Sequence, residues 1–295
     1  MSMTIDKPLQ TRRSEVRLIS RRTARSILPL SICAIIVLIV LAPLLWAIVT
    51  ALKSEVDAVA YPPTFWPSPI SFENFLRVLS GANFTAELLN SVYYSVGSVL
   101  LSMLVAAPAG YAASRLSFRG KGALMLVVLA SSMIPTVALL VPIYGLLDKF
   151  SLVNNAFAII VIEAARIAPQ NVWFIQNFVD SVPQEIEEAA FIDGASRKQT
   201  FFSIVLPLIK PGLAATFILG LITVWNDYLT VAVFAPDSAR RTLQVAIVNQ
   251  VLDSNGISWS FMMAFVLVAS TPVLIIFLAA QKWFVSGLIA GGVKG

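Results

Sequence analysis

Long apolar stretches without a single acidic or basic residue recur along the sequence. Two weaker apolar stretches lie near residues 155–179, where Glu163 and Arg166 interrupt the pattern, and near 212–235, where Asp227 does. The four uninterrupted stretches cover residues 26–52, 88–114, 122–147 and 254–281. Each is longer than the ~20 residues that an α-helix needs to cross the ~30 Å hydrocarbon core of a bilayer. The pattern therefore predicts an all-α, polytopic membrane protein with six transmembrane helices.

The segments between these stretches define the expected organisation. A basic arm at 1–26 precedes a membrane domain at 27–284, and a short tail follows at 285–295. Within the membrane domain, two connections are long enough to carry structure of their own, namely 53–87 and 180–210. The second of these is rich in acidic and small residues, which is unusual in so apolar a chain.

Lysine and arginine are distributed unevenly between the alternating segments. With the N-terminus in the cytoplasm, fifteen of the 21 basic residues fall on the inner side, and Arg166 lies within a span. The five on the outer side are Lys53, Arg77, Lys149, Arg240 and Arg241. Because basic residues accumulate in cytoplasmic loops, both termini and segment 180–210 are predicted to be cytoplasmic, and 53–87 to be external. The chain is expected in a bacterial inner membrane.

The basic N-terminal arm has two other possible interpretations, a nucleic-acid-binding arm and a signal peptide. The apolar stretch that follows is too long for the apolar region of a signal peptide and lacks a small-residue cleavage site. The arm is therefore predicted to fix the orientation of the first span, and no nucleic-acid partner is expected.

Composition excludes several kinds of chemistry. The chain has no histidine and one cysteine, Cys33, which removes the commonest general base and any disulfide within the chain. Gly120 and Lys121 are not part of a phosphate-binding loop, because Arg115 stands where its first glycine would be. We expect no metal site, no cofactor and no catalysis in this chain. If the protein takes part in an ATP-driven process, ATP and Mg²⁺ must be bound by another polypeptide.

Segment 180–210 is predicted to form two short helices joined by a turn. Ser181 with Gln184, and Ser196 with Gln199, have the spacing of capping boxes. Gly194 stands where a helix commonly ends in a left-handed residue. The two alanines of Glu188-Ala189-Ala190 add almost no bulk, so a helix that carries them fits deep in a groove on a partner.

The same segment resembles the docking motif of permease subunits in ABC importers. In that motif Glu-Ala-Ala is followed after three residues by Gly, and after nine more by Ile-x-Leu-Pro. Glu188, Gly194 and Pro207 stand at the corresponding positions. The resemblance implies that the segment contacts the cytoplasmic ATPase through Glu187, Glu188, Ala189, Ala190, Asp193, Gly194, Leu206 and Pro207.

Further motifs resemble the carbohydrate-import branch of this family, in particular the second, shorter permease of the maltose type. They lie at 61–63, 72–75, 110–116, 225–227 and 281–295. The resemblance implies a heterodimer with a second permease, two ATPase subunits, an extracytoplasmic solute-binding protein and a sugar-type solute. It also implies that the tail reaches the ATPases, with Gly291, Gly292 and Lys294 as the expected contacts.

Polar and aromatic residues at mid-span are the candidates for the solute pathway. Sugars bind to an aromatic face combined with amide and carboxylate groups, a set found at Trp225, Asn226, Asp227 and Tyr228. Further candidates are Asn90, Tyr144, Glu163, Arg166, Gln170 and Asn171. Packing or gating is an equally open interpretation of the first set. Glu163 and Arg166 share a helix face, so they can form a structural pair or line a cavity.

Two rival functions remain at this stage. A self-contained secondary transporter would use Asp227 and Glu163 as ion or proton carriers, but it leaves the docking-motif register unexplained. A membrane-embedded enzyme lacks histidine, a metal-ligand cluster and a nucleophile elbow. The prolines of the third span, Pro135 and Pro142, fit either a packing kink, or a hinge or unwound segment that faces a pathway. The identity of the solute stays open among saccharides, polyols and anionic sugar derivatives.

Overall fold

A computed structural model describes residues 9–252 and 256–292, with side-chain environments for 29–251 and 256–281. Every regular element in these ranges is helical, which confirms the all-α expectation for this part of the chain. The elements are α1 (Leu9–Ala51), α2 (Glu55–Ala58), α3 (Glu73–Leu79), α4 (Phe84–Arg115), α5 (Lys121–Ser131), α6 (Thr136–Lys149), α7 (Ala156–Asp180), α8 (Gln184–Ile192), α9 (Arg197–Thr200), η1 (Phe201–Val205), α10 (Leu206–Leu208), α11 (Lys210–Trp225), α12 (Leu229–Phe234), η2 (Ser238–Arg240), α13 (Leu243–Leu252) and α14 (Trp259–Gly292).

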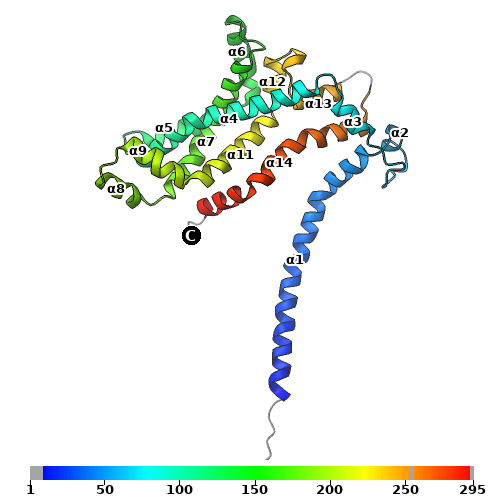
Figure 1. Ribbon diagram of the computed structural model, residues 1–295, viewed down its shortest axis with the longest axis horizontal. Coiled ribbons are helices and arrows are strands. Elements are labelled where there is room, and N and C mark those ends of the chain that lie inside the picture. The colour runs from blue at the N-terminus through cyan, green and yellow to red at the C-terminus, as the bar shows by residue number, and fades with distance from the viewer. Residues whose placement is uncertain (1–8, 253–255, 293–295) are drawn as a thin grey trace, which may run out of the picture.

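The long helix α4 spans the length of the bundle and separates its two ends. Figure 1 shows α8 and α9 at one end, called the α8 end, and α2 and α3 at the other, called the α3 end. Helix α14 runs from the α3 end toward the α8 end, whereas α1 leaves the bundle at the α3 end and projects away from it (Figure 1). The Asn74 amide donates to the carbonyls of Ala51 and Lys53, and so ties the end of α1 to α3.

Small residues allow α4 to pack closely against α7 and α11. Ser91, Ser95, Ser98 and Ser102 recur at helical spacing on α4 and are all buried. A Cβ atom added to Gly110 would lie 2.9 Å from a Cγ atom of Ile175 on α7. Since membrane helices gain little from the hydrophobic effect among themselves, such close backbone approach supplies much of their attraction.

Four described helical stretches are long and apolar enough to cross a membrane unbroken. They are Pro29–Ala51, Phe84–Arg115, Ala156–Asp180 and Trp259–Gln281. Two further pairs meet the same criteria only together, α5 with α6 and Arg197–Leu208 with α11, and they are bent by 87° and 74°. The described chain therefore has four to six spans by length and composition. The prediction of six holds only if each bent pair crosses the membrane once.

The third and fifth expected spans differ from the sequence prediction in a specific way. The stretch 122–147 is broken rather than kinked, because α5 ends before Pro135 and α6 begins after it. Pro142 lies inside α6. The fifth span ends at Trp225, not at 235, so Asn226 and Asp227 lie in the break before α12. At 1.5 Å per residue the 16 residues of α11 reach only about 24 Å.

Gly212 lies where α11 approaches α7 closely. A Cβ atom at this position would lie 2.3 Å from Cγ of Phe178, an atom at the base of the ring that cannot swing away. Gly212→Ala is therefore expected to destabilise the fold by about 1–3 kcal/mol through overpacking. Thermal unfolding of the purified chain in nanodiscs measures the effect. Gly122→Ala is the matched control, because its added Cβ atom meets nothing within 4 Å. Equal melting temperatures for the two variants would contradict this account of the packing.

Candidate functional site

Helix α8 is held against the end of α4 by a buried carboxylate. Glu187 is only 4% exposed. One of its oxygens accepts a hydrogen bond from the Tyr111 hydroxyl at 2.8 Å, and the other forms an ion pair with Arg115 Nε at 2.5 Å. Arg115 also donates to the carbonyls of Val179 and Val182, just before α8 begins. This network fixes the orientation of α8 relative to the membrane helices.

The opposite face of α8 is free of such contacts and exposed. Glu188 and Ala189 are exposed on this face, while Ala190 is buried beside Glu187. Ile192 is 87% exposed, a large apolar side chain that nothing in the described chain covers. We call Glu185, Glu188, Ala189 and Ile192 the α8 face. A small, acidic and apolar surface of this kind suits insertion into a groove on another protein.

The turn after α8 has the geometry that its sequence predicts. Asp193 is exposed at the end of α8, and Gly194 adopts a φ of 86°, the left-handed conformation expected there. The capping box of Ser196 and Gln199 is confirmed at the start of α9. The one predicted for Ser181 and Gln184 is wrong. Ser181 ends α7 and its hydroxyl donates to the Phe178 carbonyl, because the chain turns before α8 can use it.

The later part of the motif leads back into the membrane helices. Residues Phe201–Val205 form a π-helical segment, a rare geometry that is frequent at functional sites. Leu206 packs at the edge of a buried cluster with Phe201 and Val205, and Pro207 is exposed. Of the expected tail contacts, Gly291 and Gly292 lie in the last turn of α14, and Lys294 lies outside the described residues.

A second cluster of charges lies deep among the helices. Glu163, which is 0% exposed, pairs with Arg166 on the same face of α7, with Nη2 to Oε2 at 2.5 Å. This confirms the predicted pair. Arg166 also reaches Asp227 at 3.5 Å, across to the break between α11 and α12. The other Asp227 oxygen accepts from the Thr230 amide and so helps to start α12. The Arg166 guanidinium therefore connects α7, which is unbroken, to the break between α11 and α12.

Arg166 also lines a cavity of about 610 Å³ beside α6 and α7, which we call the α6–α7 cavity. Most of its wall is apolar, and its other polar groups include Gln170, Thr223 and Thr230. Asp227 and Glu163 form ion pairs with Arg166 but do not line the cavity themselves. The cavity thus combines an apolar wall with one cation whose charge is already balanced.

Trp225 and Asn226 lie on a different side of α11 from Arg166. They line a cavity of about 280 Å³ together with Gln244 of α13 and Ser270 of α14. Trp225 is 7% exposed and packs in a core cluster, and the Asn226 amide donates to the Ile222 carbonyl. Tyr228 packs at the edge of another buried cluster. The structure therefore divides the predicted Trp225–Tyr228 set between two locations.

Three other candidates are placed apart from both cavities. The Asn90 amide donates to the carbonyls of Ala239 and Arg241, which anchors the chain after η2 to α4. Asn171 is buried and donates to the Ser102 hydroxyl between α7 and α4. Tyr144 is exposed on α6 and is absent from the wall of the α6–α7 cavity. For Asn90 and Asn171 these contacts are structural.

Sequence reasoning missed the groups that join distant segments. Glu55 accepts hydrogen bonds from the amides of Trp259 and Ser260 and the hydroxyls of Ser258 and Ser260, at the start of α14. Burial raises the pKa of the Glu55 carboxyl, but these bonds outweigh burial and hold the pKa below its ordinary value. No local pattern reveals a cap that lies some 200 residues away, nor the inward orientation of Glu187.

Within the described ranges, no three histidine, cysteine, aspartate or glutamate side chains are grouped so that they could hold a metal ion. The site is instead built from a presented helix, a balanced charge cluster and cavities between apolar helices. Together these features define a helical, multi-pass membrane protein with an exposed surface helix, α8.

Comparison with known proteins identifies the family. The binding-protein-dependent transport system inner membrane component family matches residues 98–289. The permease of the diacetylchitobiose uptake system of Streptomyces coelicolor is 31% identical over 86% of this chain and 91% of its own length. The trehalose/maltose transport system permease of Thermococcus litoralis is 33% identical, over 88% and 93%. The sulfoquinovosyl glycerol transport system permease of Agrobacterium fabrum is 32% identical, over 90% and 94%.

Solved structures share the fold. A bacterial ABC transporter involved in the import of the acidic polysaccharide alginate contains a chain that matches with a TM-score of 0.75 at 23% identity, over 95% of this chain and 100% of that one. The MetNI methionine ABC transporter matches with a TM-score of 0.56 at 18% identity, over 70% and 96%. This chain therefore belongs to the binding-protein-dependent inner membrane transport family. It is a permease component of an ABC importer, a transport subunit and not an enzyme.

Proposed function

We propose that this permease forms half of the translocation pathway for a sugar or sugar derivative and is powered by a separate ATPase that docks on segment 180–210. The observation that carries the proposal is the mounting of α8. Glu187 locks the helix to α4, while the α8 face is left exposed. A movement imposed on the α8 face is thereby passed to the membrane helices through a rigid, buried contact.

The class of solute is supported by the names of the relatives. They are permeases for diacetylchitobiose, for trehalose and maltose, and for sulfoquinovosyl glycerol. These solutes are all carbohydrates or carry a sugar group, and the alignments cover most of each chain. We therefore assign a saccharide-type solute to this permease.

The orientation in the membrane follows from charge. The distribution of basic residues, fifteen against five, supports an orientation with the α8 end, both termini and the tail on the cytoplasmic side, and the α3 end on the outer side. On that arrangement ATP and Mg²⁺ act in the docked ATPase subunits, and the solute-binding protein delivers its load at the α3 end. The tail contacts that we assign to the ATPases are Gly291, Gly292 and Lys294.

A second permease completes the pathway. Helices α5 and α6 and the break between them expose large apolar side chains, with Met133 in the break 82% exposed and Val141 on α6 81% exposed. The described chain leaves this surface uncovered. Soluble monomeric proteins rarely expose so apolar a surface to water. We assign it to contact with lipid and with the partner permease. The α6–α7 cavity, with Arg166 on its wall, would then open toward the subunit interface.

The buried carboxylates also bear on the secondary-transporter alternative. An ion or proton carrier needs a carboxylate that can change its partner, whereas Arg166 bridges Glu163 and Asp227 at once. The charge cluster is therefore better explained as a joint between α7 and the α11–α12 break. A structural joint requires no ion gradient.

Reconstitution tests the proposal against this alternative. Proteoliposomes containing the permease pair, its ATPase and its solute-binding protein should accumulate the solute only with ATP and the binding protein. Dissipating the proton and sodium gradients with ionophores should leave uptake unchanged, since ATP binding alone biases the conformations. Uptake that persists without ATP and collapses with ionophores would establish the secondary transporter instead.

A further inference from the structure

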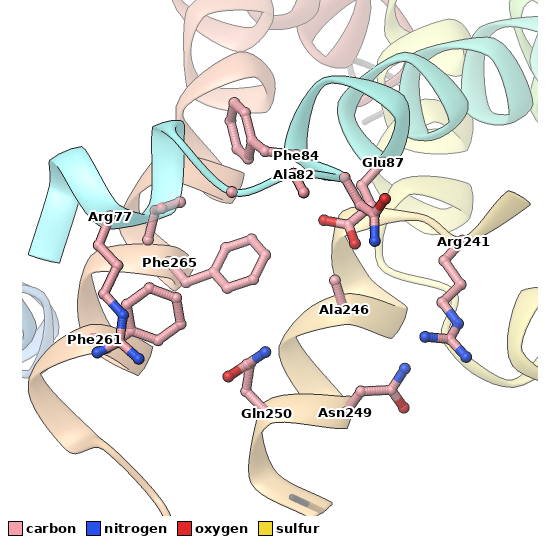
Figure 2. A pocket seen from close by; sticks show the side chains of 13 residues that line it. Arg77, Ala82, Phe84, Glu87, Arg241, Ala246, Asn249, Gln250, Phe261 and Phe265 are labelled. Carbon is pink, nitrogen blue, oxygen red and sulfur yellow. The ribbon is translucent and has the colours of Figure 1, made fainter. Parts of the chain in front are cut away.

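A polar pocket of about 250 Å³ lies at the α3 end, away from the α8 face and from both membrane cavities. Its wall is formed by α3, the start of α4, α13 and the start of α14. Figure 2 shows Arg77 and Arg241 on opposite sides, Glu87 on α4, Asn249 and Gln250 on α13, and Phe265 between them. We call this the Arg77 pocket.

The two arginines of the pocket, Arg77 and Arg241, form no ion pairs among the described residues. Arg77 stacks on the ring of Phe261, 4.6 Å from its centroid, and forms no ion pair among the described residues. Arg241 makes one long hydrogen bond, 3.5 Å to the Pro236 carbonyl, and it acts on Glu87 electrostatically from beyond ion-pair distance. Both guanidinium groups therefore retain donors for a ligand. This differs from Arg166 and Arg115, whose donors are taken by carboxylates.

The amide groups of the pocket are equally available. Asn83, Asn249 and Gln250 line it, and none of their side chains makes a hydrogen bond within the ranges that the structure describes. In contrast, the nearby Asn74 and Asn90 amides each donate to two carbonyls. The polar groups that stabilise this end of the fold are thus separate from those that line the pocket.

The combination of groups selects a particular ligand chemistry. A small inorganic anion would use the guanidinium groups but would be repelled by Glu87. A neutral sugar would use the amides and Glu87 but would leave two arginines without a counter-charge. A sugar acid satisfies all of them, because its carboxylate suits a guanidinium fork and its hydroxyls can donate to a carboxylate and to amide oxygens. Phe261 and Phe265 offer an apolar surface for the C–H face of a ring.

We propose that the Arg77 pocket binds a hydroxylated carboxylate of the size of one sugar ring, such as a hexuronate. Arg77 contacts the carboxylate, Arg241 donates to ring hydroxyls on the opposite side of the pocket, and Glu87 accepts from ring hydroxyls. The volume supports one ring, since pockets for larger ligands begin at roughly 300 Å³. The inference rests on the proposed function only in that the α3 end must meet the external solution. It adds a ligand site that is separate from the membrane pathway.

Direct binding to the full chain in nanodiscs tests the inference without any transport step. Glucuronate should bind measurably by isothermal titration calorimetry, and glucose, which has the same ring without the carboxylate, should bind at least about tenfold more weakly, because a charge-assisted bidentate contact is lost. Arg77→Gln should weaken glucuronate binding about tenfold or more for the same reason. Gln250→Ala should weaken it less.

The matched control is Arg240→Gln, which removes an exposed arginine from the same end of the molecule without touching the pocket wall. It should leave glucuronate binding unchanged. Glu87→Gln should increase the affinity for acetate, a carboxylate without hydroxyls, and should fail to increase it equally for glucuronate. Equal affinities for glucose and glucuronate, or unchanged binding in both Arg77→Gln and Gln250→Ala, would overturn the inference. These binding measurements involve no ATPase. Loss of ATPase docking would therefore not change them, and a failure of the proposed function can be distinguished from a failure of this inference.

Discussion

Replacing Glu188 by lysine is expected to abolish uptake and the copurification of the ATPase, while the permease still inserts and folds. Glu188 is exposed on α8, next to Ala189 and on the side away from Glu187, so the substitution disturbs no contact within the chain. Reversing a charge that an interface buries costs about 2–5 kcal/mol, more than tenfold in affinity. Copurification from membranes and uptake by reconstituted vesicles measure the two losses.

Two further variants make this result specific. Asp148→Lys reverses an exposed acidic residue at the end of α6, far along the chain from α8, and should leave docking intact. Glu187→Gln should lower the melting temperature, since it weakens the contacts with Tyr111 and Arg115 that mount α8. Glu188→Lys should leave the melting temperature unchanged. Normal ATPase association in Glu188→Lys would exclude the α8 face as the docking surface.

Replacing Arg166 by glutamine is expected to give the largest loss of stability of any single substitution in the membrane helices. The change leaves Glu163, which is fully buried, without its cation, and it frees Asp227 at the helix break. Removing one partner of a buried pair costs about 3–5 kcal/mol, because the remaining charge is stranded. Thermal unfolding in nanodiscs should therefore show a large drop in melting temperature.

A double variant separates the stranded charge from simple loss of packing. Glu163→Gln combined with Arg166→Gln should be more stable than Arg166→Gln alone, because no buried charge is left unpaired. Asp227→Asn should be mild, since an asparagine oxygen can still accept from the Thr230 amide. Arg119→Gln, at an exposed position, should change stability by less than about 0.5 kcal/mol. Additive effects of the two single substitutions in the double variant would contradict the coupling.

Segment 180–210 shows which structural features can be predicted from residues that are close together in sequence. Gly194 and the Ser196–Gln199 box could be predicted, because a left-handed turn and a helix cap depend on neighbours within a few residues. The orientation of α8 could not. Glu187 and Glu188 are adjacent acids with the same propensity, and only the position of Tyr111 and Arg115 decides which of them faces inward.

The candidate residues for the solute pathway also show that helical spacing predicts contacts within a helix but not contacts between helices. The Glu163–Arg166 pair followed from helical spacing alone, and the structure confirms it. Its link to Asp227 depends on where α11 ends, and the apolar stretch that Asp227 interrupts continues to residue 235, so the sequence does not mark the end of the helix. Trp225 and Arg166 line different cavities, because Trp225 faces α13 and α14 whereas Arg166, on α7, faces α6.

The order of apolar and charged residues was enough to establish that this chain is a helical membrane protein, and the spacing of the docking motif was enough to indicate its class. Both depend on properties that lie close together along the chain, namely transfer of side chains into lipid and local turn geometry. The inward face of α8, the break before α12, the Glu55 cap on α14 and the free arginines of the Arg77 pocket depend on contacts between segments distant in sequence. Such contacts are settled by packing, which determines which polar groups satisfy one another and which remain available to a ligand or a partner.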